Sequence, residues 1–322
     1  MIFEDASRCA HRIQREELNR LMLSHYGRQA SDITLLREGD NRVFRVHVPE
    51  EGSYILRLHT SGRHTPEALT SELEWLNVLA HGTPLRVPQP VRSVFNSLVV
   101  PVAFEASLSV LCTLFTWLEG ESLPEGEEFT LEQAANVGQI LARLHVEAER
   151  FQAPVHFERP EYNSAYFLSC GEEFKQNLAS SVDPRRLDLL NDCLVQLLQG
   201  LGPLEEAAGG FGIVHADVHP GNFLQHNNEL ALIDFDRCGW GPLLLDLAHA
   251  DLAMDVRARA ALMSGYTRIR PLPADYEQSL KALRVLAAIE NLTVLSRRPH
   301  ELPFVLEAMP TVEQALCGLI RS

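Results

Sequence analysis

The spacing of apolar residues changes twice within the first 117 residues. Helical spacing predicts two helices, over 7–27, which ends in glycine, and over 66–81, which begins with proline. Five short runs rich in β-branched and aromatic residues predict strands, three within 32–60 and two over 97–105 and 108–118. Turn residues separate the first three runs, which favours an antiparallel meander. We therefore expect residues 1–117 to form a five-stranded antiparallel sheet with two helices.

From residue 118 the chain is first turn-rich and acidic, and then mainly helical. Residues 118–130 predict a connecting hinge. Apolar periodicity predicts α-helices over 131–149, 164–179, 184–200, 244–264, 274–296 and 303–320. Short strand-like runs interrupt this pattern at GIVHADV, NFLQH and LALIDF, between residues 212 and 235. The whole pattern predicts an α+β protein with a smaller β-rich part, 1–117, and a larger helical part, 118–322.

Composition limits the possible partners. The 46% hydrophobic content can fill a sizeable core, and no apolar run reaches the roughly 18 residues that a membrane span needs. The charged N-terminal segment lacks the apolar stretch of a signal peptide, so we expect a cytoplasmic location. A net charge of −15 argues against nucleic-acid and anionic-membrane partners. The six cysteines are scattered and form no CxxC pair, which argues against a zinc site and against a disulfide framework.

The acidic excess is concentrated in the second part of the chain. Residues 118–322 carry 16 basic and 30 acidic residues, whereas residues 1–117 carry 12 Arg and 13 acidic residues. A cationic small molecule would be attracted to the second part, although a solvated acidic surface explains the same numbers. The sequence does not indicate an oligomeric state.

The stretch HADVHPGN, residues 215–222, and LIDFD, residues 232–236, place oxygen-bearing side chains beside short apolar runs. Phosphoryl transfer requires a carboxylate to accept a hydroxyl proton, and hard oxygen ligands to hold magnesium. We expect Asp217 to be the base, and Asn222 and Asp234 to be the metal ligands. A hairpin at HNNE, residues 226–229, would bring the two stretches together. Taken singly, each of these residues also fits an ordinary turn.

Together with GWGPLLLDLA, residues 239–248, these stretches resemble the motif region of the aminoglycoside phosphotransferase and choline kinase family. The resemblance implies a bilobal protein-kinase-like fold, and ATP and Mg²⁺ as cofactors. It also implies that Asp217 is catalytic and that Asn222 and Asp234 bind the metal. His215 would brace the loop, and Asp246 resembles the family's residue that opens the next helix, which we expect it to cap. The resemblance leaves the role of His219 open.

The resemblance also assigns nucleotide-binding residues in the first part. A strand lysine normally contacts the phosphates, but this position holds Arg57, and no lysine occurs in residues 1–117. Glu72 would hold Arg57, with Glu74 as the alternative. The turn of Gly39 and Asn41 would cover the phosphates, although a plain hairpin turn explains it equally. The adenine edge would be formed by Phe115, Thr116, Trp117 and Leu118.

For the acceptor, the sequence offers charged and aromatic candidates after the motif: Arg237, Trp240, His249, Asp251, Asp255 and Glu290. Asp251 and Asp255 would share one helix face at i, i+4. These residues favour an amino alcohol, an aminoglycoside or an amino acid such as homoserine, while Arg237 could instead bind a carboxylate.

Two other functions remain open from the sequence. Arg57 in place of lysine would suit a nucleotide-binding regulator without turnover. A protein-directed kinase of stress-response type is the other alternative, although the chain lacks an A-P-E segment and a long activation loop.

Overall fold

The computed structural model describes residues 13–39, 41–60, 62, 64–104, 109–124, 126–206 and 209–320. The chain divides into two compact units. Unit 1 comprises Met1–Gly120, Gln152–Arg159 and Ala231–Ile233. Unit 2 comprises Glu121–Phe151, Pro160–Leu230 and Asp234–Ser322. Within the described ranges, no helix combines the length and the apolar character that a bilayer crossing requires.

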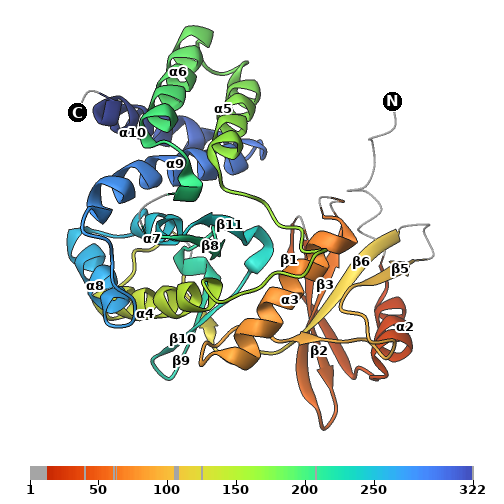
Figure 1. The fold of residues 1–322 in the computed structure, drawn as a ribbon. Helices are drawn as coiled ribbons and strands as arrows, with labels where there is room; N and C mark the ends of the chain where they lie inside the picture. The colour runs from red at the N-terminus through yellow and green to blue at the C-terminus, as the bar shows by residue number, and fades with distance from the viewer. Residues whose placement is uncertain are drawn as a thin grey trace. The chain divides into compact units, whose positions relative to one another are not determined.

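Unit 1 is built on an antiparallel sheet whose strand order is β1-β2-β3-β6-β4, with β5 also paired to β6 (Figure 1). The strands are β1 (Asp32–Glu38), β2 (Asn41–Val48), β3 (Gly52–His59), β4 (Pro90–Val91), β5 (Val100–Ala103) and β6 (Ser109–Thr116). The described residues thus give a sixth strand, β4, beyond the five expected. Its two residues follow a proline-rich stretch, and Pro90 is tolerated because β4 is an edge strand.

The helices of unit 1 are α2 (Arg15–Tyr26) and α3 (Pro66–Gly82). Helix α2 confirms the second part of the helix predicted over 7–27, while residues 7–12 lie outside the described residues. It ends at Gly27, whose φ of 64° suits glycine, and its buried face packs with the sheet in one apolar core. Helix α3 begins as its sequence predicts, with Thr65 accepting a hydrogen bond from the amide of Ala68.

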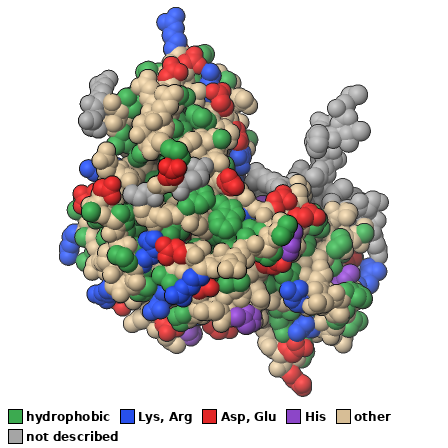
Figure 2. Space-filling view, in the orientation of Figure 1, with side chains coloured by type: hydrophobic (Ala, Val, Ile, Leu, Met, Phe, Trp, Pro, Cys, Tyr) green, Lys and Arg blue, Asp and Glu red, His purple; other side chains and the backbone are tan. Residues whose placement is uncertain are grey.

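Unit 2 is mainly helical in its described part (Figure 1). Its helices are α4 (Leu131–Ala148), α5 (Ser164–Leu178), α6 (Pro184–Leu201), α7 (Leu244–Asp251), α8 (Val256–Thr267), α9 (Tyr276–Ser296) and α10 (Leu302–Ile320). Helix α4 packs on α7 and α8, whereas α5, α6, α9 and α10 pack on one another at the other end of the unit. Figure 2 shows acidic and basic side chains interspersed over the face of this unit that is turned to the viewer.

One predicted helix is wrong in its extent. The pattern over 244–264 predicted a single helix, but the chain forms α7 and α8 with a break between them. Asp255 is the N-cap of α8, and its carboxylate accepts a hydrogen bond from the amide of Ala258. Because the N-cap residue lies outside the helix, Asp251 and Asp255 do not share the helix face that the sequence predicted.

Short strands confirm the three strand-like runs, and all of them lie in unit 2 except the second half of β10, which belongs to unit 1. They are β8 (Phe211–Val214), β9 (Phe223–His226), β10 (Glu229–Leu232) and β11 (Gly239–Pro242), together with β7 (Glu121–Ser122) inside the predicted hinge. Strands β9 and β10 are neighbours, as the predicted hairpin requires. The turn residues Asn227 and Asn228 both have positive φ, at 49° and 64°, which is the conformation of a tight two-residue hairpin turn.

Candidate active site

The loop from His215 to Asn222 follows β8 and is held at its start by a buried carboxylate. Asp246 accepts hydrogen bonds from the amides of His215, at 2.9 Å, and Ala216, at 2.8 Å. Ala216 has a positive φ of 57°, so these two bonds fix an unusual backbone conformation. The sequence predicted that Asp246 caps its own helix. That prediction is wrong, because the N-cap position of α7 is Leu243 and both carboxylate oxygens serve the loop.

A series of buried, hydrogen-bonded side chains positions the carboxylate of Asp246. Nε2 of His145 in α4 lies 3.1 Å from its carboxylate, and Nδ1 lies 2.8 Å from the hydroxyl of Tyr266. Burial by itself would raise the pKa of Asp246, but the hydrogen bond from His145 and the loop contacts lower it. The ring of His215 packs edge-on against Phe235, with 4.6 Å between centroids. The loop is therefore held by the carboxylate of Asp246 and by the packing of the His215 ring on Phe235. This environment fits the bracing role that the resemblance implied for His215.

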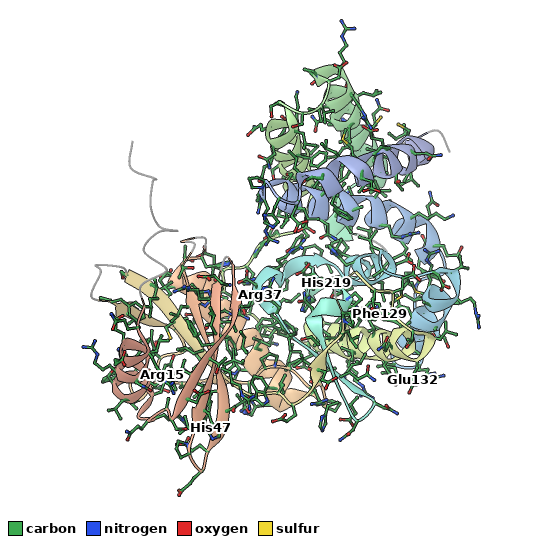
Figure 3. The ribbon with its side chains drawn as sticks, turned by 180° about the vertical axis from the view of Figure 1, so that it is seen from behind. Arg15, Arg37, His47, Phe129, Glu132 and His219 are labelled. Atoms are coloured by element: carbon green, nitrogen blue, oxygen red, sulfur yellow. The ribbon has the colours of Figure 1, made fainter. Side chains whose placement is uncertain are left out.

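Asp217 sits in this braced loop with three partners around its carboxylate. The side-chain amide of Asn222 donates to its backbone carbonyl at 2.8 Å and to Oδ2 at 3.0 Å. Nη1 of Arg237 donates to Oδ1 at 2.6 Å, and Nε2 of His219, labelled in Figure 3, lies 3.7 Å from Oδ2. Burial would raise the pKa of Asp217, but Arg237 and His219 outweigh it and hold this pKa well below its usual range.

Asn222 and Asp234 offer oxygen ligands of the kind that Mg²⁺ prefers. Because the amide nitrogen of Asn222 donates to Asp217, its amide oxygen points away from that contact. Asp234 follows β10 in the left-handed conformation, with φ of 63°. Among the described residues, no group of three or more His, Cys, Asp or Glu side chains could hold a metal ion by itself. A cation here would need oxygens from another source, such as nucleotide phosphates, to complete its coordination.

Arg237 joins Asp217 to a second buried carboxylate. Its Nη2 lies 2.5 Å from Oε1 of Glu290 in α9, and its Nη1 also lies 3.1 Å from Oδ1 of Asn291. The hydroxyl of Tyr166 in α5 donates to Oε1 of Glu290 at 2.8 Å. One planar guanidinium thus contacts both carboxylates through different nitrogens, which places the carboxylates within the span of one small group.

The charges of this network are strongly coupled. Burial would raise the pKa of Glu290, but Arg237 and His249 lower it to about 2, and Nε2 of His249 lies 3.3 Å from Oε2. Burial would lower the pKa of Arg237, but the two carboxylates raise it well above its ordinary value. Tyr166 and Asn291 were not predicted from the sequence. Tyr166 lies in an ordinary amphipathic helix, and only the position of Asn291 next to Glu290 could have indicated it.

The other acceptor candidates have different surroundings. The carboxylate of Asp251 is buried and forms ion pairs with Arg259 and, at 2.8 Å, with Arg284. Trp240 lies in β11, where its backbone exchanges hydrogen bonds with Pro160 and Tyr162. With Asp255 engaged as a cap, the structure brings Arg237, His249 and Glu290 together with Asp217, and gives Asp251 separate ionic partners.

In unit 1, Arg57, which is expected to contact the nucleotide phosphates, forms the predicted pair with Glu72. Nη1 of Arg57 in β3 lies 3.1 Å from Oε1 of Glu72 in α3, and Glu72 is only 1% exposed. The guanidinium of Arg57 also lies over the ring of Phe115 in β6, 5.1 Å from its centroid. The alternative partner, Glu74, instead contacts His156 at 3.1 Å. Arg57 is therefore positioned by a buried carboxylate and an aromatic face.

Two backbone amides of the expected adenine edge already donate hydrogen bonds within unit 1. The amide of Thr116 donates to the carbonyl of Gln89, and the amide of Trp117 donates to that of Ser53. Backbone recognition of a base along this run would therefore depend on Leu118 and on carbonyl groups. In the hairpin between β1 and β2, the amide of Gly39 donates to the carbonyl of Asn41 at 3.2 Å, while Asp40 lies outside the described residues.

A fold with this sheet and this braced loop is that of small-molecule kinases, and the family comparison agrees. The model of the phosphotransferase enzyme family, APH, matches residues 32–277, and the chain belongs to this family. Its fold is similar to that of an amicoumacin kinase in complex with AMP-PNP, Ca²⁺ and Ami, with 19% identity and a TM-score of 0.76, covering 96% of both chains.

Two further similarities extend this comparison. The microcompartment-associated aminopropanol kinase has 26% identity and a TM-score of 0.76, covering 94% of this chain and 96% of that chain. The amicoumacin kinase of Bacillus subtilis (strain 168) is 23% identical over 227 residues, which are 70% of this chain. The match spans 64% of that relative's length, which is less than two thirds of it.

Proposed function

We propose that the chain is an ATP- and Mg²⁺-dependent kinase that transfers the γ-phosphoryl group to a hydroxyl of a small molecule. The observation that carries this proposal is the environment of Asp217. Its carboxylate is ionised, oriented by Asn222 and Arg237, and set on a loop whose first two amides are bound by Asp246. Membership of the phosphotransferase enzyme family supports the same reaction.

In this reaction Asp217 orients the acceptor. The hydroxyl donates its proton to the carboxylate as its oxygen attacks the γ-phosphorus, and the bond to the bridging oxygen of the nucleotide breaks. The lowered pKa makes Asp217 a weak base, so its main contribution is to hold the hydroxyl in line and receive the proton late. Arg237 must release one oxygen of Asp217, or share it, when the hydroxyl binds.

The residues proposed to bind the nucleotide have separate roles. Arg57, held by Glu72, would contact the phosphates, and its permanently charged, planar guanidinium can contact two oxygens at once. Phe115 and the backbone of Thr116–Leu118 would bound the base, and the turn of Gly39 and Asn41 would cover the phosphates. Asn222 and Asp234 would hold Mg²⁺, which when bound neutralises charge on the phosphate oxygens.

For the acceptor we propose a small molecule that carries both a hydroxyl and an amine. Arg237 bridges Asp217 and Glu290, so a hydroxyl at Asp217 and an ammonium at Glu290 would occupy the same short span. Glu290 is buried, ionised and already paired with Arg237, so a substrate ammonium would share or replace this cation. Similarity to an aminopropanol kinase, whose name gives an acceptor with both an amine and a hydroxyl, supports this choice.

The test is acceptor-dependent formation of ADP from ATP, or of GDP from GTP, with Mg²⁺. The panel contains small amino alcohols, aminoglycosides and homoserine, each paired with an analogue in which the amine is replaced by a methyl group. We expect turnover with an amine-containing acceptor and at least tenfold lower kcat/KM for its methyl analogue. The Asp217→Asn variant gives the background. If no acceptor gives turnover above this background, the proposed kinase activity is wrong. If each acceptor and its methyl analogue are used equally well, only the proposed requirement for an amine is wrong.

A further inference from the structure

Two cysteines far apart in the sequence meet in the part of unit 2 that lies away from Asp217's loop. Cys193 in α6 and Cys317 in α10 are both thiols, and their sulfur atoms are 3.9 Å apart. Helices α6 and α10 pack directly on each other, as Figure 1 also shows. The same seam carries an ion pair in which Arg186 contacts Glu313 through two nitrogens, at 2.7 to 3.1 Å. The two sulfurs are therefore held together by a fixed pair of helices.

The two cysteines line one cavity, and Cys317 is the more exposed of them. The cavity has a volume of about 310 Å³, and its wall also includes Leu189, Pro310 and Gln314. Cys317 is partly exposed and Cys193 is 9% exposed. By contrast, Cys112 and Cys238 are fully buried, and burial raises the pKa of both Cys112 and Cys170 to about 12. Among the cysteines that the structure describes, the pair in the cavity thus has the environment best suited to oxidation.

We propose that Cys193 and Cys317 form a reversible disulfide when the protein meets a peroxide. A disulfide requires about 2.05 Å between sulfurs, so each sulfur has to move by roughly 1 Å, which side-chain rotation and a small helix adjustment provide. Cys317, the more exposed thiol, attacks one peroxide oxygen as the O–O bond breaks, giving a sulfenic acid and water. The sulfur of Cys193 then attacks the sulfenic sulfur, the S–S bond forms, and a second water leaves. Two thiols supply the two electrons, and a dithiol reductant reverses the reaction.

The bond would cross-link helices that support the acceptor side of the site. Helix α6 packs on α5, which carries Tyr166, and α10 packs on α9, which carries Glu290 and Asn291. A cross-link between residues 193 and 317 restricts a long loop in the unfolded chain. Oxidation should therefore raise the thermal stability of this helical end. The inference rests on the two thiols and their cavity, and it holds whether or not the proposed kinase activity is correct.

The experiment uses the full chain with Cys9→Ser, because Cys9 lies outside the described residues and could form other bridges. The protein is treated with hydrogen peroxide, and half is then reduced with dithiothreitol. We expect the oxidised sample to lose two thiols, to yield one cross-linked peptide containing Cys193 and Cys317, and to melt on the order of 5 °C higher. Reduction should restore the thiols and the original melting temperature.

Three variants in the same background complete the test. Cys193→Ser and Cys317→Ser should each lose both the cross-linked peptide and the peroxide-dependent rise in melting temperature, while the control Cys170→Ala keeps both. Circular dichroism checks that each variant is folded before treatment, and Cys193→Ala replaces the serine variant if that variant unfolds. A cross-link between other cysteines, thiol loss without a cross-link, or an equal shift in the Cys317→Ser variant would overturn the proposal.

Discussion

Asp217 and Arg237 form a hydrogen-bonded ion pair in which Nη1 of the guanidinium donates to Oδ1 of the carboxylate at 2.6 Å. The same guanidinium lies 2.5 Å from Glu290, so the proposed base and the proposed amine-binding acid share one cation. Neither carboxylate can change its charge or position without affecting the other.

Replacing Asp217 by Asn should lower kcat by about 10² to 10⁴-fold, because the amide cannot accept the proton of the attacking hydroxyl. The fold should persist, since Asn keeps the shape of the side chain. ATP binding, followed by isothermal titration, should change by less than about threefold. In the parent protein, the low pKa of Asp217 keeps its carboxylate ionised. Protonation of Asp217 should therefore not lower kcat at any pH above 3.8, the ordinary pKa of this side chain. A variant as active as the parent would remove Asp217 from the mechanism.

The pair of Arg57 and Glu72 should control nucleotide affinity. Arg57→Ala removes the phosphate contact and leaves the buried Glu72 without this partner, so KM for ATP should rise about tenfold or more and unit 1 should lose stability. Arg57→Lys should recover most of the charge but not the planar contact, and should give an intermediate KM. Glu74→Gln is the matched control, because Glu74 contacts His156 instead. Unchanged KM values in all three variants would show that Arg57 does not contact the nucleotide.

Asp234→Asn should raise the Mg²⁺ concentration needed for half-maximal activity by at least about tenfold, since a charged ligand becomes neutral. The saturating rate with excess metal should recover in part. Metal titration of the kinase rate at fixed ATP measures this, and Asp236→Asn serves as the neighbouring control. Equal metal requirements for the two variants would contradict the assignment of Asp234.

Glu290 should make unit 2 less stable in acid. Its pKa is lowered from its ordinary value of 4.5 to about 2 in the folded protein, so the unfolded chain takes up this proton first as pH falls. The stabilisation is therefore complete above about pH 4.5 and is lost as pH falls through about 2, and its size is on the order of 3 kcal/mol. Thermal unfolding between pH 2 and 7 measures it.

Glu290→Gln should be less stable than the parent at pH 7, because Arg237 loses a buried partner. The same variant should show a flatter dependence of melting temperature on pH between about 4.5 and 2. Some acid dependence should remain, since the pKa of Asp217 is also lowered. An acid dependence identical to that of the parent would mean that Glu290 is not ionised in the folded protein.

Asp246→Ala should destabilise unit 2 by about 3 kcal/mol or more, because the amides of His215 and Ala216 and the ring of His145 lose their shared acceptor. Hydrogen exchange at residues 215 and 216 should accelerate strongly. Asp255→Ala is the control, since it removes only a helix cap and should cost about 1 kcal/mol. Equal exchange rates at the loop in both variants would contradict the bracing role.

The sequence was most informative where local chemistry decides the structure. Turn residues and apolar runs predicted the strands around Asp217, and the helix positions of Glu72 and Glu74 narrowed the partner of Arg57 to two residues. Both predictions depend on short-range spacing, because a strand alternates and a helix repeats every 3.6 residues.

Long-range relationships were less predictable. Asp255 reads as a continuation of a helical pattern, yet its carboxylate caps a new helix, which periodicity alone does not distinguish. The contact of Asp246 with the loop and the contact of Tyr166 with Glu290 join residues 31 and 124 positions apart. Such contacts follow from the packing of helices on one another, and no local pattern specifies them.

The anchoring of the loop by Asp246 has a consequence for how this protein could acquire new substrates. The residues that brace the loop before Asp217, His145 and Asp246, come from α4 and α7, whereas Tyr166, Glu290 and Asn291 come from α5 and α9. On the proposed assignment of Glu290 to the acceptor, mutations that reshape α5 and α9 should alter acceptor preference while the loop keeps its supports. Laboratory evolution toward a different acceptor should therefore accumulate substitutions in these two helices, and leave His145 and Asp246 untouched.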